Sequence, residues 1–580
     1  MGTSLKKRGQ KLIKRFSRAS VKASEESRER IEENFIQRLS HIKNVKLLIF
    51  EWGLLVLALI MLATAQAFWF SNSYAENTFI SGGSYTEATL GRVNSMNPLF
   101  ATTSSEKTLS RLMFATLATI DYTGNPKPEL AQSIRPSEDG KVWTLKLREG
   151  LKWSDGEALT NEDVLFTINL IQNPAVNTIY NSNLANVKVR ENEAGEIVFT
   201  LPAAYADFVT ALEIPIVPKH ELADANIKTL VEDEFSNSPV TCGAFKFNAL
   251  QTTIVDGEEV VYLAANPYYY LGRPMLNTFA IHTFLTKDEV VTAMNAGTIT
   301  ATAELAGIDA DKVTSASFIK QESPLSAGVF IFFNTENNFL KNVEFRRTIR
   351  KGISLEALRE KAPGRNAIDY PLLKTQIVLQ NYPTLPSESF LEATTEVETL
   401  TESTGEKIIL DIATVNSGYL PAVAEELKNE LVALGIEANL TVYEENQDFI
   451  ANVLAKRNYD ILVYEIEMGA DPDPLPYYHS SQATAAGLNL SNYSSVMVDD
   501  LLVGARETLD TALRAKKYES FLNYWVADVP AIGLYQADMC YIYNRNARAY
   551  NEDIVLTVAL DRFSDVLEYA TVKGVRDLTP

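Results

Sequence analysis

The stretch NYDILVYEIEMGADPDPLPYYH, residues 458–479, decides how the rest of this chain is interpreted. It begins with a short apolar run, Ile461 to Tyr464, whose length indicates a strand buried on both faces rather than a helix. Proline lacks a backbone donor and fixes φ, so Gly469 and the prolines after it must take the chain out of the sheet. The carboxylates of Asp471 and Asp473 are therefore expected at the carboxyl end of a strand.

The residues before this stretch predict a repeating strand and helix pattern. Strands are predicted at 407–413 and 437–443 with a helix at 420–434 between them, and a second helix at 446–456 leads into the next strand. This β-α-β-α-β order implies a parallel sheet with right-handed crossovers. Open sheets of this kind bind ligands beyond the carboxyl ends of their strands, where Asp471 falls. The alternative is that the Asp-Pro-rich loop is only a turn.

Length and charge indicate several lobes in two different surroundings. A chain of 580 residues that is 46% hydrophobic can bury several cores, so two or three globular lobes are expected. Residues 1–46 carry 13 Lys or Arg and 5 Glu, a net charge of +8 within a chain of net charge −21. The remainder is therefore strongly acidic.

An apolar segment separates these two parts. Leu54 to Phe70, extended backwards to residue 47, approaches the roughly 20 apolar residues that a bilayer requires. Trp52 and Trp69 stand where an aromatic belt would place them, and the basic residues before the segment predict a cytoplasmic N-terminus. We therefore expect a single-pass transmembrane anchor at 47–70, with the acidic bulk outside the cell. A cleaved signal peptide is the alternative.

The basic segment itself, residues 1–46, is expected to lie in the cytoplasm. Its apolar residues recur at helical spacing between charges, which predicts an amphipathic helix on the inner face of the membrane. A solvated coil or a docking helix for a partner remains an alternative.

Six motifs together resemble a known family. They are NSMNPLF from Asn94, GNPKPELAQSIRPSEDGKVWTLKLREGLKWSDGEALTNEDVLFTI from Gly124, PVTCGAFKF from Pro239, AANPYYYLGRP from Ala264, FFNTENNFLKNVEFRRTIRKGIS from Phe332 and DVPAIGLYQ from Asp528. In order and spacing they resemble the peptide/nickel (family 5) solute-binding proteins of bacterial ABC importers. The resemblance extends from Ser81 to about Asn551.

This resemblance implies an α/β fold, the bilobal clamshell of periplasmic binding proteins of type II, in the large class that carries an extra domain. By motif order, lobe I is expected at 81–117, 232–324 and 536–580. The extra domain is expected at 118–231 and lobe II at 325–535. The parallel unit inferred from the residues falls inside lobe II.

The resemblance also implies a ligand-binding loop. In peptide-binding relatives an aspartate after this strand pairs with the ligand's α-ammonium group, and Asp471 matches it. A carboxylate in a closed, poorly hydrated cleft is a strong partner for a cation. Met468, Gly469, Ala470 and Asp473 are expected to line the same pocket. Relatives often carry Trp where Met468 stands, so the pocket around the first ligand residue is expected to differ.

Further candidates follow from the same resemblance. The strand from Val329 to Asn334 is expected to enter lobe II and to hydrogen-bond the backbone of an extended peptide, with Phe332 and Asn334 among the binding residues. The alternative is that its phenylalanines are simply core. Asn97, with its loop neighbours Asn94 and Met96, and Tyr477, with Tyr478 and His479, are further candidates for the cleft.

Enzymatic chemistry is not expected. The sequence contains no G-x-S-x-G, Walker, H-E-x-x-H or C-x-x-C motif, and its four histidines are scattered, so neither a cofactor nor a metal site is expected. Asp471 and Asp473 lack the glycine and distal glutamate of a calcium loop. Cys242 and Cys540, both in the expected lobe I, are a possible disulfide, with two separate buried thiols as the alternative.

The expected function is that of a membrane-anchored, extracytoplasmic solute-binding protein of a bacterium. It would take a peptide in the interlobe cleft and deliver it to the permease and ATPase subunits of an ABC importer, as a monomer and without a nucleic-acid partner. One alternative is a ligand-sensing receptor that signals through its cytoplasmic N-terminus. Another is a binder of a non-peptide ligand such as a nickel chelate.

Overall fold

The computed structural model describes residues 46–577 except 122, 177, 185, 253–258 and 445. The side chains of residues 46–49, 67–77, 182–183 and 575–577 also lie outside the description. The basic segment at 1–46, with its expected amphipathic helix, falls almost wholly outside the described residues. The chain divides into two compact units, one formed by residues 1–78 and 573–580 and the other by residues 79–572.

The first unit contains α3 (Lys46–Tyr74), a helix of 29 residues. The described side chains of this helix, from Phe50 to Gln66, are all exposed. After α3, β1 (Ala75–Ile80) pairs with β18 (Val572–Asp577). No helix within the described residues has the length and apolar character needed to cross a membrane. The anchor at 47–70 stays a prediction from the sequence.

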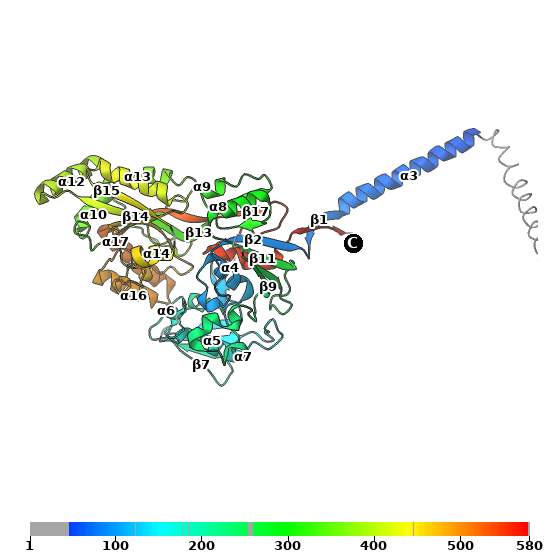
Figure 1. Cartoon of the computed structure of the whole chain (residues 1–580), viewed down its shortest axis with the longest axis horizontal. Helices are drawn as coiled ribbons and strands as arrows, with labels where there is room; N and C mark the ends of the chain where they lie inside the picture. Colours follow the sequence, from blue (N-terminus) through cyan, green and yellow to red (C-terminus); the bar gives the residue numbers. More distant parts are fainter. Residues whose placement is uncertain are drawn as a thin grey trace, which may run out of the picture. The chain divides into compact units, whose positions relative to one another are not determined.

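The second unit is built on one mixed sheet (Figure 1). In spatial order its ten described strands are β15 (Glu437–Tyr443), β14 (Ile409–Val415), β16 (Ile461–Glu467), β13 (Phe318–Phe333), β17 (Ala531–Asn544), β12 (Ala301–Thr302), β2 (Ser84–Leu90), β11 (Thr278–Phe284), β10 (Glu259–Ala265) and β9 (Phe245–Thr252).

The predicted β-α-β-α-β unit is confirmed. β14 pairs in parallel with both β15 and β16, and α13 (Leu420–Ala433) connects the first two of these strands. The second connection differs from the prediction, because a short helix, α14 (Gln447–Phe449), continues into a five-residue π turn, η7 (Ile450–Leu454). The carboxyl ends of the three parallel strands therefore meet at one edge of the sheet.

The two longest strands, β13 and β17, run antiparallel through the middle of the sheet. Their register shifts between Pro324 and Gly328, where residues 325–327 of β13 face the single residue Ala537 of β17. A bulge of this kind bends and twists the strands locally. Before the shift β17 also pairs with β12, and after it β13 also pairs with β16, so the shift separates two halves of the sheet.

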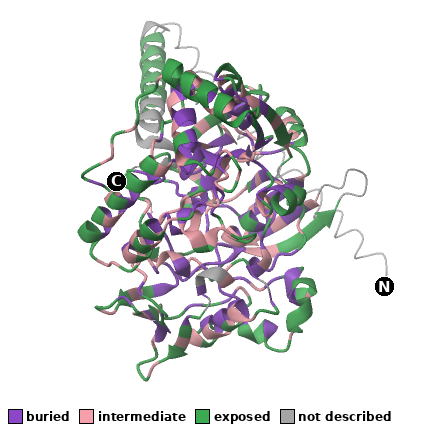
Figure 2. Cartoon of the chain, turned by 90° about the vertical axis from the view of Figure 1, so that its left-hand side faces the viewer, coloured by how far each residue is buried: buried purple, intermediate pink, exposed green. Residues whose placement is uncertain are grey.

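Buried residues occur throughout the second unit (Figure 2), and their two largest apolar clusters follow the same division. One cluster of buried apolar side chains is drawn entirely from residues 329–535, and a second from residues 85–301 and 539–569. The lobe boundaries expected at 324/325 and 535/536 fall at the register shift between these clusters. The structure therefore offers a physical basis for the boundaries, which remain a proposal.

Residues 118–231 contain a second, smaller sheet. Its described strands, in spatial order, are β5 (Ala131–Pro136), β6 (Val142–Leu147), β8 (Ile197–Thr200) and β7 (Lys188–Glu191). Between β6 and β7 in the sequence lies α5 (Asn161–Gln172), which begins with a capping box of Thr160 and Asp163. A two-stranded sheet pairs β3 (Ala118–Ile120) with β4 (Pro126–Pro128).

The remaining described helices cover the sheets or connect their strands. The α-helices are α4 (Ser104–Met113), α6 (Asn181–Leu184), α7 (Lys219–Leu222), α8 (Lys287–Ala296), α9 (Ile308–Asp311), α10 (Val343–Gly352), α11 (Leu355–Glu360), α12 (Phe390–Thr404), α15 (Leu475–Tyr478), α16 (Val496–Arg506) and α17 (Thr511–Asp528). The short 3-10 helices are η3 (Pro98–Phe100), η4 (Thr210–Leu212), η5 (Ile227–Glu232), η6 (Glu234–Ser236), η8 (Ser480–Gln482) and η9 (Ala559–Glu568).

The disulfide considered from the sequence is wrong. Cys242 and Cys540 are both free and buried, and they belong to different apolar clusters. The Cys242 thiol lies against Ala115, whereas Cys540 lies on β17 in the cluster that includes Met294 of α8. Burial raises the pKa of Cys242 to about 12 and that of Cys540 to about 11. Both behave as separate buried thiols.

Candidate functional site

The loop after β16 is held in place by backbone contacts. The amides of Met468 and Gly469 donate to the carbonyl of Ser326, inside the register shift of β13, at 2.7 and 3.1 Å. The side chain of Gln376 donates to the Met468 and Gly469 carbonyls at 3.2 and 2.9 Å. Gly469 has a φ of +63°, in the left-handed region that favours glycine. These contacts fix where Asp471 projects.

The carboxylate of Asp471 meets a residue from the distant 118–231 segment. The hydroxyl of Tyr205 donates to Asp471 Oδ2 at 2.6 Å. Within the described residues no Lys, Arg or His side chain lies at ion-pair distance from Asp471, although its two neighbouring aspartates both have such partners. Asp471 is thus a half-buried carboxylate with a neutral donor and no protein cation.

The two neighbouring aspartates are paired. Asp473 accepts from Arg506 Nε at 2.6 Å and from the Leu475 amide at 3.0 Å. Asp207, close in sequence to Tyr205, forms an ion pair with Arg514 of α17. Three carboxylates therefore share two guanidinium groups, and the cluster has one negative charge in excess when all three are ionised.

This imbalance changes the protonation of Asp471. Burial, followed by the negative charges of Asp473 and Asp207, raises the pKa of Asp471 well above its usual range. Burial also raises the pKa of Tyr205, so its phenol stays protonated and remains a donor. A cation placed beside Asp471 would replace the missing positive charge and favour the ionised carboxylate.

A cavity of about 210 Å³ lies beside α4. It is lined by residues of α4, by Glu213 and by residues 558–561, and Arg111 and Glu213 face one another in it at 3.8 Å. Burial raises the pKa of Glu213 to about 7. Glu213 follows Tyr205 in the same connecting segment, and the amide of Ser326 donates to the carbonyl of Thr557, next to the cavity wall. Ser326 therefore hydrogen-bonds both to the Asp471 loop and to the residue that precedes Val558 of the cavity wall.

A larger cavity of about 890 Å³ lies elsewhere, against α10, α12 and α17. None of the binding residues predicted from the sequence lines either cavity. The chemical argument for a site therefore rests on the Asp471 cluster.

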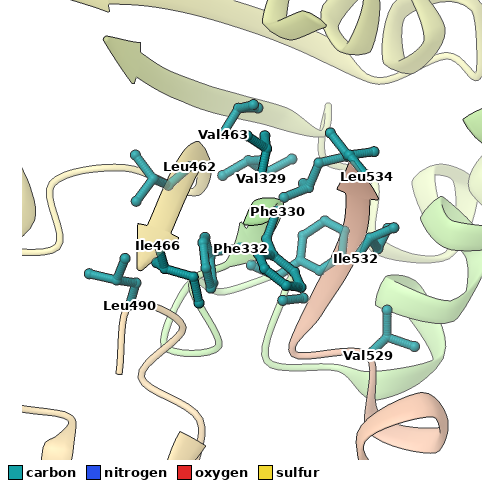
Figure 3. Close-up of a cluster of buried hydrophobic side chains, with 14 of the residues drawn as sticks. Val329, Phe330, Phe332, Leu462, Val463, Ile466, Leu490, Val529, Ile532 and Leu534 are labelled. Carbon is teal, nitrogen blue, oxygen red and sulfur yellow. The ribbon is translucent and has the colours of Figure 1, made fainter. Parts of the chain in front are cut away.

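Two predicted binding residues lie in the core or at the far end of the sheet. Phe332 is 1% exposed and packs among apolar side chains of β16 and β17 (Figure 3). Asn334 donates to the carbonyls of Arg457 and Tyr459. At about 3.3 Å per strand residue, Asn334 lies roughly 25 Å along β13 from Ser326.

The expected pairing of β13 with a peptide backbone is wrong. Residues Ala327 to Phe333 pair with β16, and Gly328 to Phe332 pair on the other side with β17. Both edges of this part of β13 are occupied by the protein's own strands. No ligand strand can be added there without breaking the sheet.

The other predicted residues have local structural roles. Asn97 is fully buried and caps η3 through a hydrogen bond from the Leu99 amide, while its Nδ2 has no partner among the described residues. Tyr477 donates its hydroxyl to the carbonyl of Glu467. Ala470 is half-buried within the loop. Of the predicted set, only the residues from Met468 to Asp473 lie together around Asp471.

The remaining four candidates named from the sequence also have local roles. His479 Nδ1 accepts a hydrogen bond from the Ser481 amide at 3.0 Å. Met96 is 4% exposed and Asn94 donates to Glu106, so both stabilise the chain before α4. Tyr478 is completely buried against Phe521 and Trp525.

The residues that surround Asp471 from other elements were not predicted from the sequence. They are Tyr205, Asp207, Gln376, Arg506 and Arg514. One of them could have been identified from the sequence pattern. Arg514 lies on the stripe of α17 that also buries Tyr518, Leu522 and Trp525, and a cation on an apolar stripe indicates a buried partner. The sequence around Tyr205 and Gln376 shows no comparable pattern.

Comparison with known proteins agrees with this architecture. Residues 125–488 match the family model described as bacterial extracellular solute-binding proteins, family 5 Middle. The oligopeptide-binding protein AppA of Bacillus subtilis is 23% identical over 491 residues, which cover 81% of this chain and 89% of that protein. Protein XP55 of Streptomyces lividans is 26% identical over 449 residues, 72% of this chain and 77% of that protein.

Solved structures show the same fold. The structure of B. subtilis AppA in complex with a nonapeptide matches with a TM-score of 0.69 and 21% identity, over 85% of this chain and 100% of that one. NikZ of Campylobacter jejuni in complex with Ni(L-His) matches with a TM-score of 0.72 and 22% identity, over 84% of this chain and 99% of that one. The expected α/β fold of periplasmic binding proteins is confirmed.

Proposed function

Because the chain belongs to the family 5 bacterial extracellular solute-binding proteins, we propose that it captures peptides with a free amino terminus and delivers them to an ABC importer. The observation that carries this proposal is Asp471, a half-buried carboxylate without a protein cation. A ligand ammonium group would balance the excess negative charge of the three-aspartate cluster. AppA, a sequence relative and a structural neighbour, is an oligopeptide-binding protein.

The geometry supports binding by charge rather than by backbone pairing. The neighbouring strand β13 has no free edge, so a peptide must be held at its end and by pocket contacts. The hydroxyl of Tyr205 can rotate to accept from an ammonium group while that group pairs with Asp471.

A second ligand class is favoured by one observation, the structural similarity to NikZ in complex with Ni(L-His). A metal chelate of an amino acid also carries polar and charged groups of amino-acid origin. The free carboxylate of Asp471 could bind such a ligand too. Binding of a chelate without any binding of peptides would favour this class.

Import and anchoring complete the proposal. A permease and an ATPase encoded beside this gene would support delivery to an importer, and their absence would favour the ligand-sensing receptor. The apolar segment at 47–70 and the basic residues before it support a membrane anchor with the binding unit outside the cell.

The function is tested with the full-length chain purified in detergent. Native mass spectrometry with a mixture of tripeptides to nonapeptides selects a ligand, and calorimetry then compares that peptide with its N-acetylated form. Asp471→Asn and acetylation should each weaken binding by roughly 2–4 kcal/mol, the scale for removing one member of a buried charge pair. Asp500→Asn, an exposed aspartate, is the matched control and should bind normally. Equal affinities in all four measurements would contradict the proposal.

A further inference from the structure

A second cluster of chemically active side chains lies away from Asp471. Asp155, His220 and Glu221 bring one nitrogen and two carboxylate oxygens within 4.8 Å of one another. The histidines are scattered in the sequence, but folding places His220 beside a carboxylate that is 65 residues away. We propose that these three residues bind a divalent transition metal ion such as Zn²⁺ or Ni²⁺.

The first ligand is held by a rigid turn. The amide of Glu157 donates to Asp155 Oδ1 at 3.0 Å, which leaves Oδ2 directed towards His220. The amide of Gly156 donates to the Trp153 carbonyl at 3.0 Å and closes the turn. Metal-binding carboxylates are commonly oriented by such a hydrogen bond to their second oxygen.

The other two ligands are consecutive residues of α7, labelled in Figure 1. The preceding residue is fixed, because the amide of Lys219 donates to Asp163 Oδ1 at 2.9 Å. His220 Nε2 lies 2.9 Å from Asp155 Oδ2 and 3.9 Å from Glu221 Oε1. The turn at 153–157 and the start of α7 are both fixed by hydrogen bonds from backbone amides, and together they place the three donor atoms close to one another.

The spacing of these donors suits a metal ion. Zn²⁺ binds His nitrogen and carboxylate oxygen at about 2.0–2.2 Å, so neighbouring ligands in a tetrahedral or octahedral site lie roughly 3–3.5 Å apart. The two measured spacings, 2.9 and 3.9 Å, bracket this range, and all three donors lie within 4.8 Å of one another, so Glu221 must rotate inward to complete the set. One nitrogen with two oxygens is a donor set that suits Zn²⁺, Ni²⁺ and Cu²⁺ better than Ca²⁺.

The site is open to solvent. The side chains of Asp155, His220 and Glu221 are 33%, 32% and 44% exposed. An ion can therefore enter without unfolding, and water would occupy the remaining coordination positions, as in metal sites with three protein ligands. The site uses none of the residues around Asp471, so it is independent of the proposed function.

The simpler interpretation is an ion pair of His220 with Asp155 alone. The two interpretations differ at Glu221, because the ion pair does not need this carboxylate whereas a three-ligand site does. The fluorescence of Trp153 can report metal binding, because its ring centroid lies 6.2 Å from that of His220. Bound Ni²⁺ or Cu²⁺ should quench the fluorescence of this tryptophan.

The test uses untagged full-length protein in detergent, titrated with Ni²⁺ or Zn²⁺ by calorimetry and with Ni²⁺ by fluorescence. We expect one saturable site, quenching that is lost in Trp153→Phe, and affinities at least about tenfold lower in His220→Ala and Glu221→Gln. Glu221→Gln alters an exposed side chain outside the His220–Asp155 hydrogen bond, so its folding should be normal even if His220→Ala is destabilised.

His479→Ala is the matched control, because among the described residues one carboxylate lies at ion-pair distance from His479, that of Asp499 at 3.8 Å. This variant should bind the metal like the unaltered protein. Unchanged binding in Glu221→Gln, equal losses in His479→Ala and His220→Ala, or several weak sites without saturation would each show an adventitious ion only and overturn the proposal.

Discussion

Tyr205 Oη and Asp471 Oδ2 lie 2.6 Å apart although 266 residues separate them in the chain. The contact joins the segment at 118–231 to the loop after β16. Arg506 strengthens the same junction, because its guanidinium lies 5.2 Å from the centre of the Tyr205 ring and pairs with Asp473. Asp471, the residue proposed to bind the ligand, is thus held by two regions that come together only in the folded protein.

Removing this hydroxyl should have two effects. Tyr205→Phe leaves the half-buried carboxyl group of Asp471 without its donor, so we expect a loss of about 1.5 kcal/mol in the free energy of unfolding. The pKa of Asp471 should rise further, because the hydrogen bond from Tyr205 favours its ionised form. Urea denaturation measures the first effect. Tyr524→Phe, at a tyrosine that is 37% exposed, is the control and should change stability very little.

Ligand binding should release a proton below the raised pKa of Asp471. The free carboxyl group is protonated there because burial and two neighbouring aspartates oppose its charge, and an incoming ammonium group favours ionisation. Affinity for a cationic ligand should therefore increase with pH until that pKa is passed.

Calorimetry in two buffers of different ionisation enthalpy counts the released protons. Asp471→Asn should abolish the release that depends on this group. Equal proton release in the variant and the unaltered protein would show that another group is responsible.

The same carboxyl group should make the empty protein less stable as pH rises. Its folded-state pKa lies above the unfolded value of about 3.9, so the folded state binds the proton more tightly. The contribution to stability is present below the unfolded pKa and is lost as pH rises through the folded one. Ligand would reverse this loss by replacing the proton.

Much of the fold was predictable because it depends on local patterns. The parallel strands around α13 follow from short apolar runs alternating with a helical period, and the capping box of Thr160 and Asp163 marks the start of α5. The loop at Asp471 was predictable for the same reason, since proline must end a strand.

The partners of Asp471 could not be predicted in this way. Tyr205 and Gln376 reach the loop through contacts between distant segments, which no periodicity records. The free edge expected for β13 was wrong for a related reason. The sequence shows a buried strand but not which neighbours it has, and β16 and β17 occupy both sides. Cys242 and Cys540 were likewise expected in the same lobe, but they are buried in different apolar clusters.

Gly469 should matter for binding as well as for stability. Alanine at its φ of +63° should cost about 1 kcal/mol of folding stability, although no atom would contact the added methyl group within 4 Å. Relief of that strain would also move the backbone that carries Asp471, so peptide affinity should fall. Gly405→Ala is the matched control, because Gly405 has a φ of +66° and the same open space but ends α12. It should lose similar stability and bind peptide normally.

The membrane anchor should be visible in cell fractions. If residues 47–70 remain attached, membranes should contain the full-length chain, with its N-terminus protected from protease added outside the cell. The acidic part of the chain after residue 70 should be accessible to the same protease, and it should be digested when a denaturant is added. A soluble form beginning near Phe68 would contradict the anchor and favour a cleaved signal peptide.

The last prediction concerns Arg365, which pairs with both long strands beside their register shift. Its Nη1 lies 2.8 Å from Glu322 of β13 and 2.9 Å from Asp538 of β17, and burial raises the pKa of Asp538 to about 6. Arg365→Met would leave Asp538, with a side chain only 8% exposed, without its cation. We expect a loss of about 3 kcal/mol in the free energy of unfolding at pH 8.

The loss should be smaller at pH 5. Without Arg365 the folded-state pKa of Asp538 lies higher than in the unaltered protein, so at pH 5 its carboxyl group is protonated and needs no cationic partner. Denaturant titrations at the two pH values measure the difference. Arg135→Met is the control, since Arg135 is 62% exposed in its pair with Glu196 and should contribute little at either pH. A loss in Arg365→Met that does not depend on pH would show that Arg365 stabilises this junction by packing rather than by its charge.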